Sequence, residues 1–150
     1  MPCNNDCDKT VYAKPGTCAS CHMQLVEKSL LTFKNLSVDE FCERISSNSN
    51  AVVLDVRSEN EFKGKGLRST YGHFKNAINI NITELKDRLS ELKKYKDREV
   101  LVYCSHSVRS PRACLLLSEN GFTNVSNMAG GVSTINKISS DCLRGNYVEH

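Results

Sequence analysis

The feature that most constrains this chain is an alternation of short apolar runs with amphipathic stretches, which begins at Leu30. Two of the runs, 51–56 and 100–103, are apolar at nearly every position, as is typical of strands buried on both faces of a parallel sheet. We expect five strands, over residues 31–33, 51–56, 77–80, 100–103 and 124–128. Strands that alternate with helices predict an α/β fold, with a central, mostly parallel sheet flanked by helices.

Helix signals fall between these runs. Two Ser-x-x-Glu capping boxes, at Ser37 and Ser58, predict the starts of helices. Apolar residues at helical spacing predict a charged helix over 82–92. A further helix is expected over 110–119, because Gly121 follows it as a stop signal.

The counts exclude several classes of protein. A length of 150 residues suits one ordinary domain with a small appendage. The net charge is only +3, so we expect no nucleic-acid partner and no membrane surface. No apolar run approaches the roughly 18 residues of a spanning helix. The N-terminal residues are polar and acidic, unlike a secretory signal, so we expect a cytoplasmic protein.

Cysteine divides the chain into regions of different character. Four of the eight cysteines lie in the first 21 residues, a clustering that favours a metal site in a reducing compartment over a disulfide framework. This stretch has too few apolar residues to form a core of its own. We therefore expect a Cys-rich, metal-stapled module over 1–29, an α/β domain over 30–144 and a tail over 145–150.

The most informative stretch is the one in which a hydrophobic strand leads directly into Cys104, a polar loop and a helix. Ligands of open α/β sheets bind beyond the carboxyl ends of the strands. A helix N-terminus adds unpaired N–H groups and a partial positive charge, and Arg109 and Arg112 add fixed charge. We expect Cys104 to be an ionised, accessible nucleophile. The alternative, a buried strand-end cysteine, is disfavoured by the polar residues that follow it.

Four motifs that include this loop occur in a recognisable order. They are Leu54-Asp55-Val56-Arg57 with Glu61-Phe62, Gly72-His73-Phe74-Lys75-Asn76-Ala77-Ile78-Asn79-Ile80, Cys104 to Ser110, and Met128-Ala129-Gly130-Gly131-Val132. Residues 30 to about 140 thereby resemble a rhodanese-like domain, the sulfurtransferase fold. The resemblance implies that Cys104 takes a sulfane sulfur from thiosulfate or another donor as a persulfide. It implies transfer to a thiol or a cyanide-like acceptor, with no cofactor at this site.

The same resemblance implies roles for individual residues. Cys104 and Arg109 would be the catalytic residues. Backbone N–H groups of the loop would hold the persulfide or the donor, and these belong to Ser105, His106, Ser107, Val108 and Arg109. Supporting positions close to the loop would be Asp55 and Arg57. His73 is also expected to have a supporting role, in which it orients the backbone near a strand end.

Loop length and one substitution bear on the chemistry. Four residues separate Cys104 from Arg109, whereas the related phosphatases and arsenate reductases need five, so those activities are disfavoured. Ser107 stands where the family often has glycine. If φ is positive there, serine costs about 1 kcal/mol or more. This departure leaves open a catalytically weak protein that binds or senses metal. The long segment 63–71 is either a basic lid or a solvated loop.

Other cysteines and histidines have weaker signals. Cys42 and Cys114 fall on amphipathic helices, which favours core packing for both. Cys142 could resolve a Cys104 persulfide by disulfide exchange. His106 could tune Cys104 or contact the donor, although an exposed loop histidine is the simpler interpretation.

The N-terminal cysteines form two pairs, Cys3-x3-Cys7 and Cys18-x2-Cys21. Four thiolates suit tetrahedral Zn²⁺ best, and soft ligands also suit Cu(I). With Asp8-Lys9-Thr10-Val11-Tyr12, Lys14-Pro15-Gly16, His22-Met23 and Leu25-Val26, they resemble the small heavy-metal-binding domain of metal-efflux ATPases and efflux-pump subunits, over residues 3–26. Asn4 and Asn5 replace the proline and methionine of that family, which weakens the case for Cu(I). A redox dithiol or an unmetallated tail is the alternative.

Overall fold

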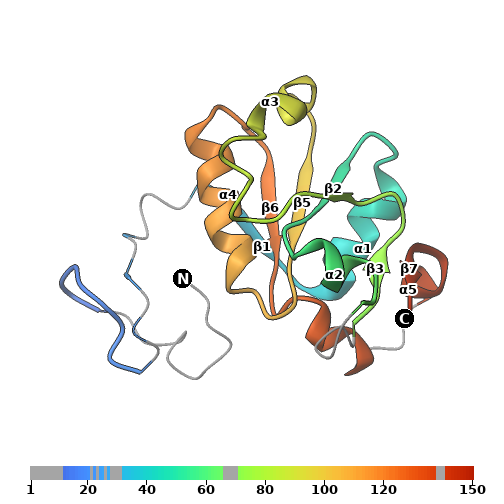
Figure 1. Ribbon diagram of the computed structural model, residues 1–150, viewed down its shortest axis with the longest axis horizontal. Helices are drawn as coiled ribbons and strands as arrows, with labels where there is room; N and C mark the ends of the chain where they lie inside the picture. The colour runs from blue at the N-terminus through green and yellow to red at the C-terminus, as the bar shows by residue number, and fades with distance from the viewer. Residues whose placement is uncertain are drawn as a thin grey trace.

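The computed structural model describes residues 12–20, 22, 24–25, 27, 32–65, 71–137 and 141–150. Its central element is a five-stranded sheet in the order β1-β6-β5-β2-β4, and every neighbouring pair is parallel (Figure 1). The strands are β1 (Lys34–Leu36), β2 (Val52–Asp55), β4 (Ile78–Asn79), β5 (Val100–Tyr103) and β6 (Val125–Met128). The α/β fold predicted from the alternating pattern is therefore confirmed.

The first strand lies three residues later than expected. We predicted a strand over 31–33, but β1 covers Lys34–Leu36. Its pairing decides this, because Lys34 is the first residue in register with β6, opposite Ser126. Phe33 precedes the ladder and is buried in the core as a bend residue.

Helices connect the strands on both sides of the sheet. They are α1 (Val38–Ser47), α2 (Glu59–Phe62), α3 (Leu89–Leu92), α4 (Arg109–Glu119) and α5 (Asp141–Asn146), with 3-10 segments η3 (Lys93–Tyr95) and η4 (Val132–Lys137). Both predicted capping boxes are present. The Ser37 hydroxyl accepts from the Glu40 N–H, and the Glu40 carboxylate accepts from the Ser37 N–H at 2.7 Å. Ser58 and Glu61 repeat this arrangement at α2.

The helix predicted over 82–92 is mostly wrong. Only Leu89–Leu92 forms α3, and residues 82–88 form consecutive turns. The Asn81 side chain accepts from the Thr83 N–H, and i→i+3 bonds such as Glu84 N–H to Asn81 C=O follow. Leu85 and Leu92 are still buried. The spacing of the apolar residues therefore correctly indicated which side chains are buried, although the backbone does not form a continuous helix.

Alternate residues of the buried strands contribute to two separate cores, one on each face of the sheet. Val100 and Val102 of β5 pack into a cluster with α4, whereas Leu101 and Tyr103 pack into a cluster with α1. Period-two alternation within fully apolar strands produces this division. Cys104 continues the pattern and falls in the α4 cluster.

The strands β3 (His73–Phe74) and β7 (Tyr147–Val148) and the helix α5 were not predicted. β3 pairs antiparallel with β7, which makes a separate two-stranded sheet. Residues 145–150, which we expected to be a tail, instead include the end of α5 and this strand. The described parts of the chain contain no helix long and apolar enough to cross a membrane.

Candidate active site

The Cys104 loop has the predicted strand-loop-helix geometry. β5 ends at Tyr103, the loop begins with Cys104, and α4 begins at Arg109. The loop therefore lies at the carboxyl edge of the parallel sheet, where ligands of such sheets bind.

The loop packs directly on the backbone of the Gly130-Gly131 turn. The carbonyl of Cys104 accepts from the Val132 N–H at 3.0 Å, and the carbonyl of Ser105 accepts from the Ser133 N–H at 2.9 Å. Gly131 has φ +65°, and a Cβ there would lie 2.5 Å from both loop carbonyls. Glycine is therefore required at this position on two counts, its backbone conformation and the close approach.

Ser107 adopts a left-handed conformation, so the condition under which serine is strained at this position is met. Its φ is +55°, and the residue has no exposed surface. Its hydroxyl accepts a hydrogen bond from Asn127 Nδ2 at 3.0 Å, and the same amide group donates to Asn35 Oδ1 at 2.7 Å. Asn127 was missed in the sequence, although an Asn in a buried strand is a signal that it must have a hydrogen-bonding partner.

Cys104 itself differs from expectation in one respect. We predicted an accessible thiol, but the residue has 0% exposed surface and belongs to the same apolar cluster as Val56 and Ala113. Its Sγ lies 3.3 Å from the hydroxyl of Ser110 in the first turn of α4. That hydroxyl can donate to a thiolate, a contact that the sequence did not reveal. In this conformation a donor reaches Sγ only if the loop moves.

The backbone of the loop offers a set of donors. Within the described part of the chain, the N–H groups of Ser105, His106, Ser107 and Val108 donate no hydrogen bond to another residue. They lie between Cys104 and the N-terminus of α4, whose helical dipole adds partial positive charge. Such a run of N–H groups is suited to hold an anion.

Arg109 is held by Glu61 in a two-bond ion pair. Its Nη1 and Nη2 each donate to a carboxylate oxygen of Glu61 at 2.7 Å, and Nη2 also donates to Ser105 Oγ at 2.7 Å. Hydrogen bonding from Arg109, together with the capping bonds of Ser58, lowers the pKa of Glu61 to about 2. The Arg109 charge is thus balanced in place, and the guanidinium braces the loop through Ser105.

Asp55 and Arg57 form a buried ion pair at the end of the neighbouring strand β2. Arg57 Nη2 donates to Asp55 Oδ2 at 2.7 Å and to the Gly72 carbonyl at 2.8 Å. Tyr71, next in the chain to Gly72, lies with its hydroxyl 3.5 Å from His106 Nε2, and the two rings are edge-to-face. Arg57 is thereby linked to His106 of the Cys104 loop through the 71–72 segment, and Asp55 pairs in register with Tyr103, the residue before Cys104.

The two histidines of the motifs are in different surroundings. His106 is exposed at the top of the loop, as the simpler interpretation predicted. His73 packs on the Phe62 ring and lies 3.4 Å from a ring nitrogen of His150. Burial and the neighbouring His150 lower the pKa of His73.

The remaining cysteines are arranged differently from the prediction. Cys42 is fully buried, but it forms a disulfide with Cys142, so Cys142 does not stand ready to resolve Cys104. Cys114 is buried in the α4 cluster as expected, and burial raises the pKa of its thiol.

A cavity of about 440 Å³ lies at the amino ends of β2 and β4, at the opposite edge of the sheet from Cys104.

The predicted metal site falls largely on residues that the structure does not describe. Cys3, Cys7 and Cys21 lie outside the described residues, and no group of three metal-binding side chains occurs among those described. Cys18 is buried, with its Sγ 3.3 Å from the Tyr12 hydroxyl. The His22 N–H donates to the Cys18 carbonyl at 2.9 Å, which closes a tight turn after the cysteine. The segment 63–71, for which we considered a basic lid or a solvated loop, is described only in part. In the described part, Lys63 forms an ion pair with Glu59.

Comparisons with known proteins agree with this geometry. A model of the rhodanese-like domain matches residues 37–137. The uncharacterized protein YqhL of Bacillus subtilis is 39% identical over 98 residues, which cover 65% of this chain and 68% of that protein. The chain therefore belongs to the rhodanese-like domain family.

Other relatives are longer proteins. The tRNA uridine(34) hydroxylase of Buchnera aphidicola is 31% identical over 124 residues, which cover 71% of this chain and 37% of the hydroxylase. The chain thus spans little more than a third of that relative. Among solved structures, a rhodanese-related protein from Thermoplasma volcanium is 28% identical with a TM-score of 0.58, and the match covers 72% of this chain and 96% of the other.

Proposed function

We propose that this protein is a single-domain sulfurtransferase that forms a persulfide on Cys104 and passes the sulfane sulfur to a thiophilic acceptor. The observation that carries the proposal is the loop itself. A cysteine at the end of a parallel strand is followed by four residues whose N–H groups donate to no other residue among those that the structure describes. A sulfur anion attached to Cys104 is the kind of group that such donors stabilise.

The reaction balances without a cofactor. With thiosulfate as donor, the Cys104 thiolate bonds to the outer sulfur, the sulfur–sulfur bond of thiosulfate breaks, and its electron pair leaves with sulfite. Cyanide or a thiolate then bonds to the outer persulfide sulfur and restores the Cys104 thiolate. Ser110 Oγ, at 3.3 Å, is placed to donate to Sγ in its ionised form.

The ion pair of Arg109 argues against phosphatase chemistry. A phosphatase needs its loop arginine to hold a tetrahedral oxyanion, but this guanidinium is already engaged by Glu61 through two bonds. We therefore assign Arg109 a positioning role, in which it holds Ser105 and the loop backbone in place.

A second candidate function is favoured by the burial of Cys104. A domain whose thiol stays covered would bind or sense a ligand and transfer sulfur weakly or not at all. The 0% exposure of Cys104 supports this alternative. For the sulfurtransferase, the Cys104 loop must move to expose Sγ to the donor.

Several relatives are named for a different activity, the hydroxylation of a tRNA uridine. tRNA hydroxylation belongs to relatives of which this chain spans about a third, so we do not extend it to this protein. The small net charge of +3 also favours a small-molecule donor and acceptor over a nucleic acid.

Thiocyanate formation from thiosulfate and cyanide tests the proposal. We expect Cys104→Ser to lose the activity and the persulfide seen by mass spectrometry. The matched control is Cys114→Ala, which removes a buried thiol of the same core cluster and should retain turnover. A wild type without turnover or persulfide would leave the binding function. Aryl phosphate hydrolysis that depends on Cys104 would instead favour a phosphatase.

We further propose that Cys3, Cys7, Cys18 and Cys21 hold one soft metal ion, with Zn²⁺ the best match to four thiolates. The tight turn after Cys18 supports a knuckle that presents Cys18 and Cys21 to one ion. Purified protein should carry about one Zn²⁺ per chain, and Cys18→Ser with Cys21→Ser should remove it. Disulfides among the four cysteines in metal-free protein would contradict the proposal.

A further inference from the structure

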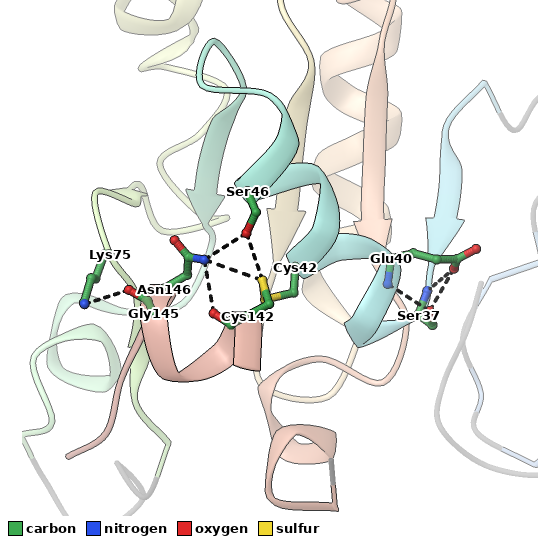
Figure 2. Close-up of a disulfide and its surroundings, with 8 residues drawn as sticks. All are labelled: Ser37, Glu40, Cys42, Ser46, Lys75, Cys142, Gly145 and Asn146. Carbon is green, nitrogen blue, oxygen red and sulfur yellow. Dashed lines mark hydrogen bonds between the residues drawn. A yellow bond between two sulfur atoms is a disulfide. The ribbon is translucent and has the colours of Figure 1, made fainter. Parts of the chain in front are cut away.

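The Cys42–Cys142 disulfide joins two elements that are distant in sequence. Cys42 lies in α1 and Cys142 in α5, 100 residues later, with their Cα atoms 5.9 Å apart. Figure 2 shows the two helices meeting at this bond. The two sulfurs are unlike in surroundings, since Cys42 has 0% exposed surface whereas Cys142 is partly exposed.

Two polar side chains surround the sulfur of Cys142 (Figure 2). Because a disulfide sulfur has no hydrogen, the Ser46 hydroxyl donates to Cys142 Sγ, at 3.1 Å. Asn146 Nδ2 donates to Ser46 Oγ and to the Cys142 carbonyl, both at 3.1 Å, and lies 3.5 Å from the same sulfur, so it orients the Ser46 hydroxyl beside Sγ. A hydroxyl that is held in position to donate to a sulfur stabilises that sulfur as a thiolate. A buried sulfur such as that of Cys42 is poorly ionised and hard to reach.

We propose that this pair is a second sulfur-exchange centre for small thiols and disulfides, in which Cys142 is the reactive sulfur and Cys42 the resolving one. It is independent of sulfur transfer at Cys104, and neither mechanism requires the other.

Closure and opening balance with a small disulfide RSSR and its thiol RSH. In closure, the Cys142 thiolate bonds to one sulfur of RSSR and RS⁻ leaves. Cys42 then gives up its proton, bonds to Cys142 Sγ, and displaces the second RS⁻. The two cysteine protons end on two RSH molecules, so two thiols are oxidised and one RSSR is reduced. Opening by RSH is the reverse and begins with attack on Cys142 Sγ.

Opening the bond removes a tether from the C-terminal segment 141–150. Without it, this segment is still held by the short β3–β7 pairing, by the Lys75 N–H to Asn146 carbonyl bond at 2.8 Å, and by the packing of Tyr147 on Phe74. Side chains add the Lys75 ammonium bond to the Gly145 carbonyl at 2.7 Å, the contact of the His150 ring with the Phe62 carbonyl at 2.9 Å, and the burial of Leu143. Few backbone bonds hold such a segment, so it should open locally more often once the disulfide is reduced.

Single variants of the full chain, incubated with glutathione disulfide, test the order of reaction by peptide mass mapping. Cys42→Ser cannot resolve the intermediate, so a glutathione adduct should accumulate on Cys142. In Cys142→Ser, the fully buried Cys42 should react at least about tenfold more slowly. An adduct on Cys42 at a similar rate, or none on Cys142 in Cys42→Ser, would overturn the proposal.

Two measurements on the wild type guard against a variant that fails to fold. After reduction, iodoacetamide should alkylate Cys142 before Cys42, and the opposite order would contradict the assignment. Amide hydrogen exchange in residues 141–150 should speed up when the wild type is reduced but stay unchanged when Cys142→Ser is treated in the same way. Equal exchange in oxidised and reduced wild type would exclude a tether.

Discussion

Neutralising Glu61 is the sharpest test of how the Cys104 loop is held. Glu61→Gln keeps the shape of the side chain and can still close the capping box at Ser58, because glutamine serves in that role as glutamate does. What it removes is the charge that faces Arg109 across two hydrogen bonds of 2.7 Å. The substitution therefore isolates the ion pair from the helix cap.

The expected size follows from the pKa of Glu61. A fall from the ordinary 4.5 to about 2 corresponds to about 3 kcal/mol of stabilisation, since one pKa unit is about 1.4 kcal/mol. The side chains of Arg109 and Glu61 keep 28% and 24% of their surface exposed, so solvent screens part of this energy. We expect a coupling of about 1–2 kcal/mol between the two residues.

Urea unfolding of Glu61→Gln, Arg109→Gln and the double variant gives this coupling as a double-mutant cycle. The pH dependence gives a second reading. Because the folded pKa lies below the unfolded one, the stabilisation is fully present above about pH 4.5 and disappears as the pH falls towards 2. The wild type should therefore lose its advantage over Glu61→Gln within that window.

A coupling below about 0.3 kcal/mol, comparable to a weak surface pair, would refute the reasoning. So would an unchanged difference between wild type and Glu61→Gln from pH 7 to pH 3.

Three further changes have predictable effects on the free energy of unfolding, measured with urea at pH 7. Asp55→Asn leaves the buried Arg57 cation without its counter-charge and should destabilise the protein by about 3–5 kcal/mol, whereas a loss under about 1 kcal/mol would mean the pair is solvated. Gly131→Ala forces a Cβ against two loop carbonyls at positive φ and should cost about 2 kcal/mol or more, while Gly145→Ala, which meets no atom within 4 Å, should change stability by less than about 0.5 kcal/mol. Cys142→Ser should lose roughly 3–5 kcal/mol relative to the oxidised wild type, because the disulfide closes a loop of 100 residues, and it should match the wild type measured with reductant.

Much of the fold could be predicted because strong local signals coincide with tertiary burial. β5 is a continuous apolar run, and both capping boxes start helices where the spacing indicated. The 82–92 segment shows that apolar spacing alone does not determine the backbone conformation. Its apolar residues are buried at helical intervals, but the backbone follows the sheet in turns, and periodicity cannot distinguish these cases.

Parts of the site could not be read from sequence because they depend on long-range contacts. The Arg109–Glu61 pair joins residues 48 positions apart, and the disulfide joins residues 100 apart. A positive φ at Ser107 was considered only as a condition, and the Asn127 side chain that holds its hydroxyl comes from a neighbouring strand. The burial of Cys104 likewise depends on how α4 and β2 pack around it, which local polarity does not report.

The most direct test of the central claim is the mass of the Cys104 peptide after the protein has been incubated with thiosulfate and separated from it. If Cys104 transfers sulfur, that peptide should gain one sulfur atom, which disappears on addition of cyanide as thiocyanate is released. An unmodified Cys104 peptide, or a sulfur that cyanide does not remove, would contradict sulfur transfer at this loop.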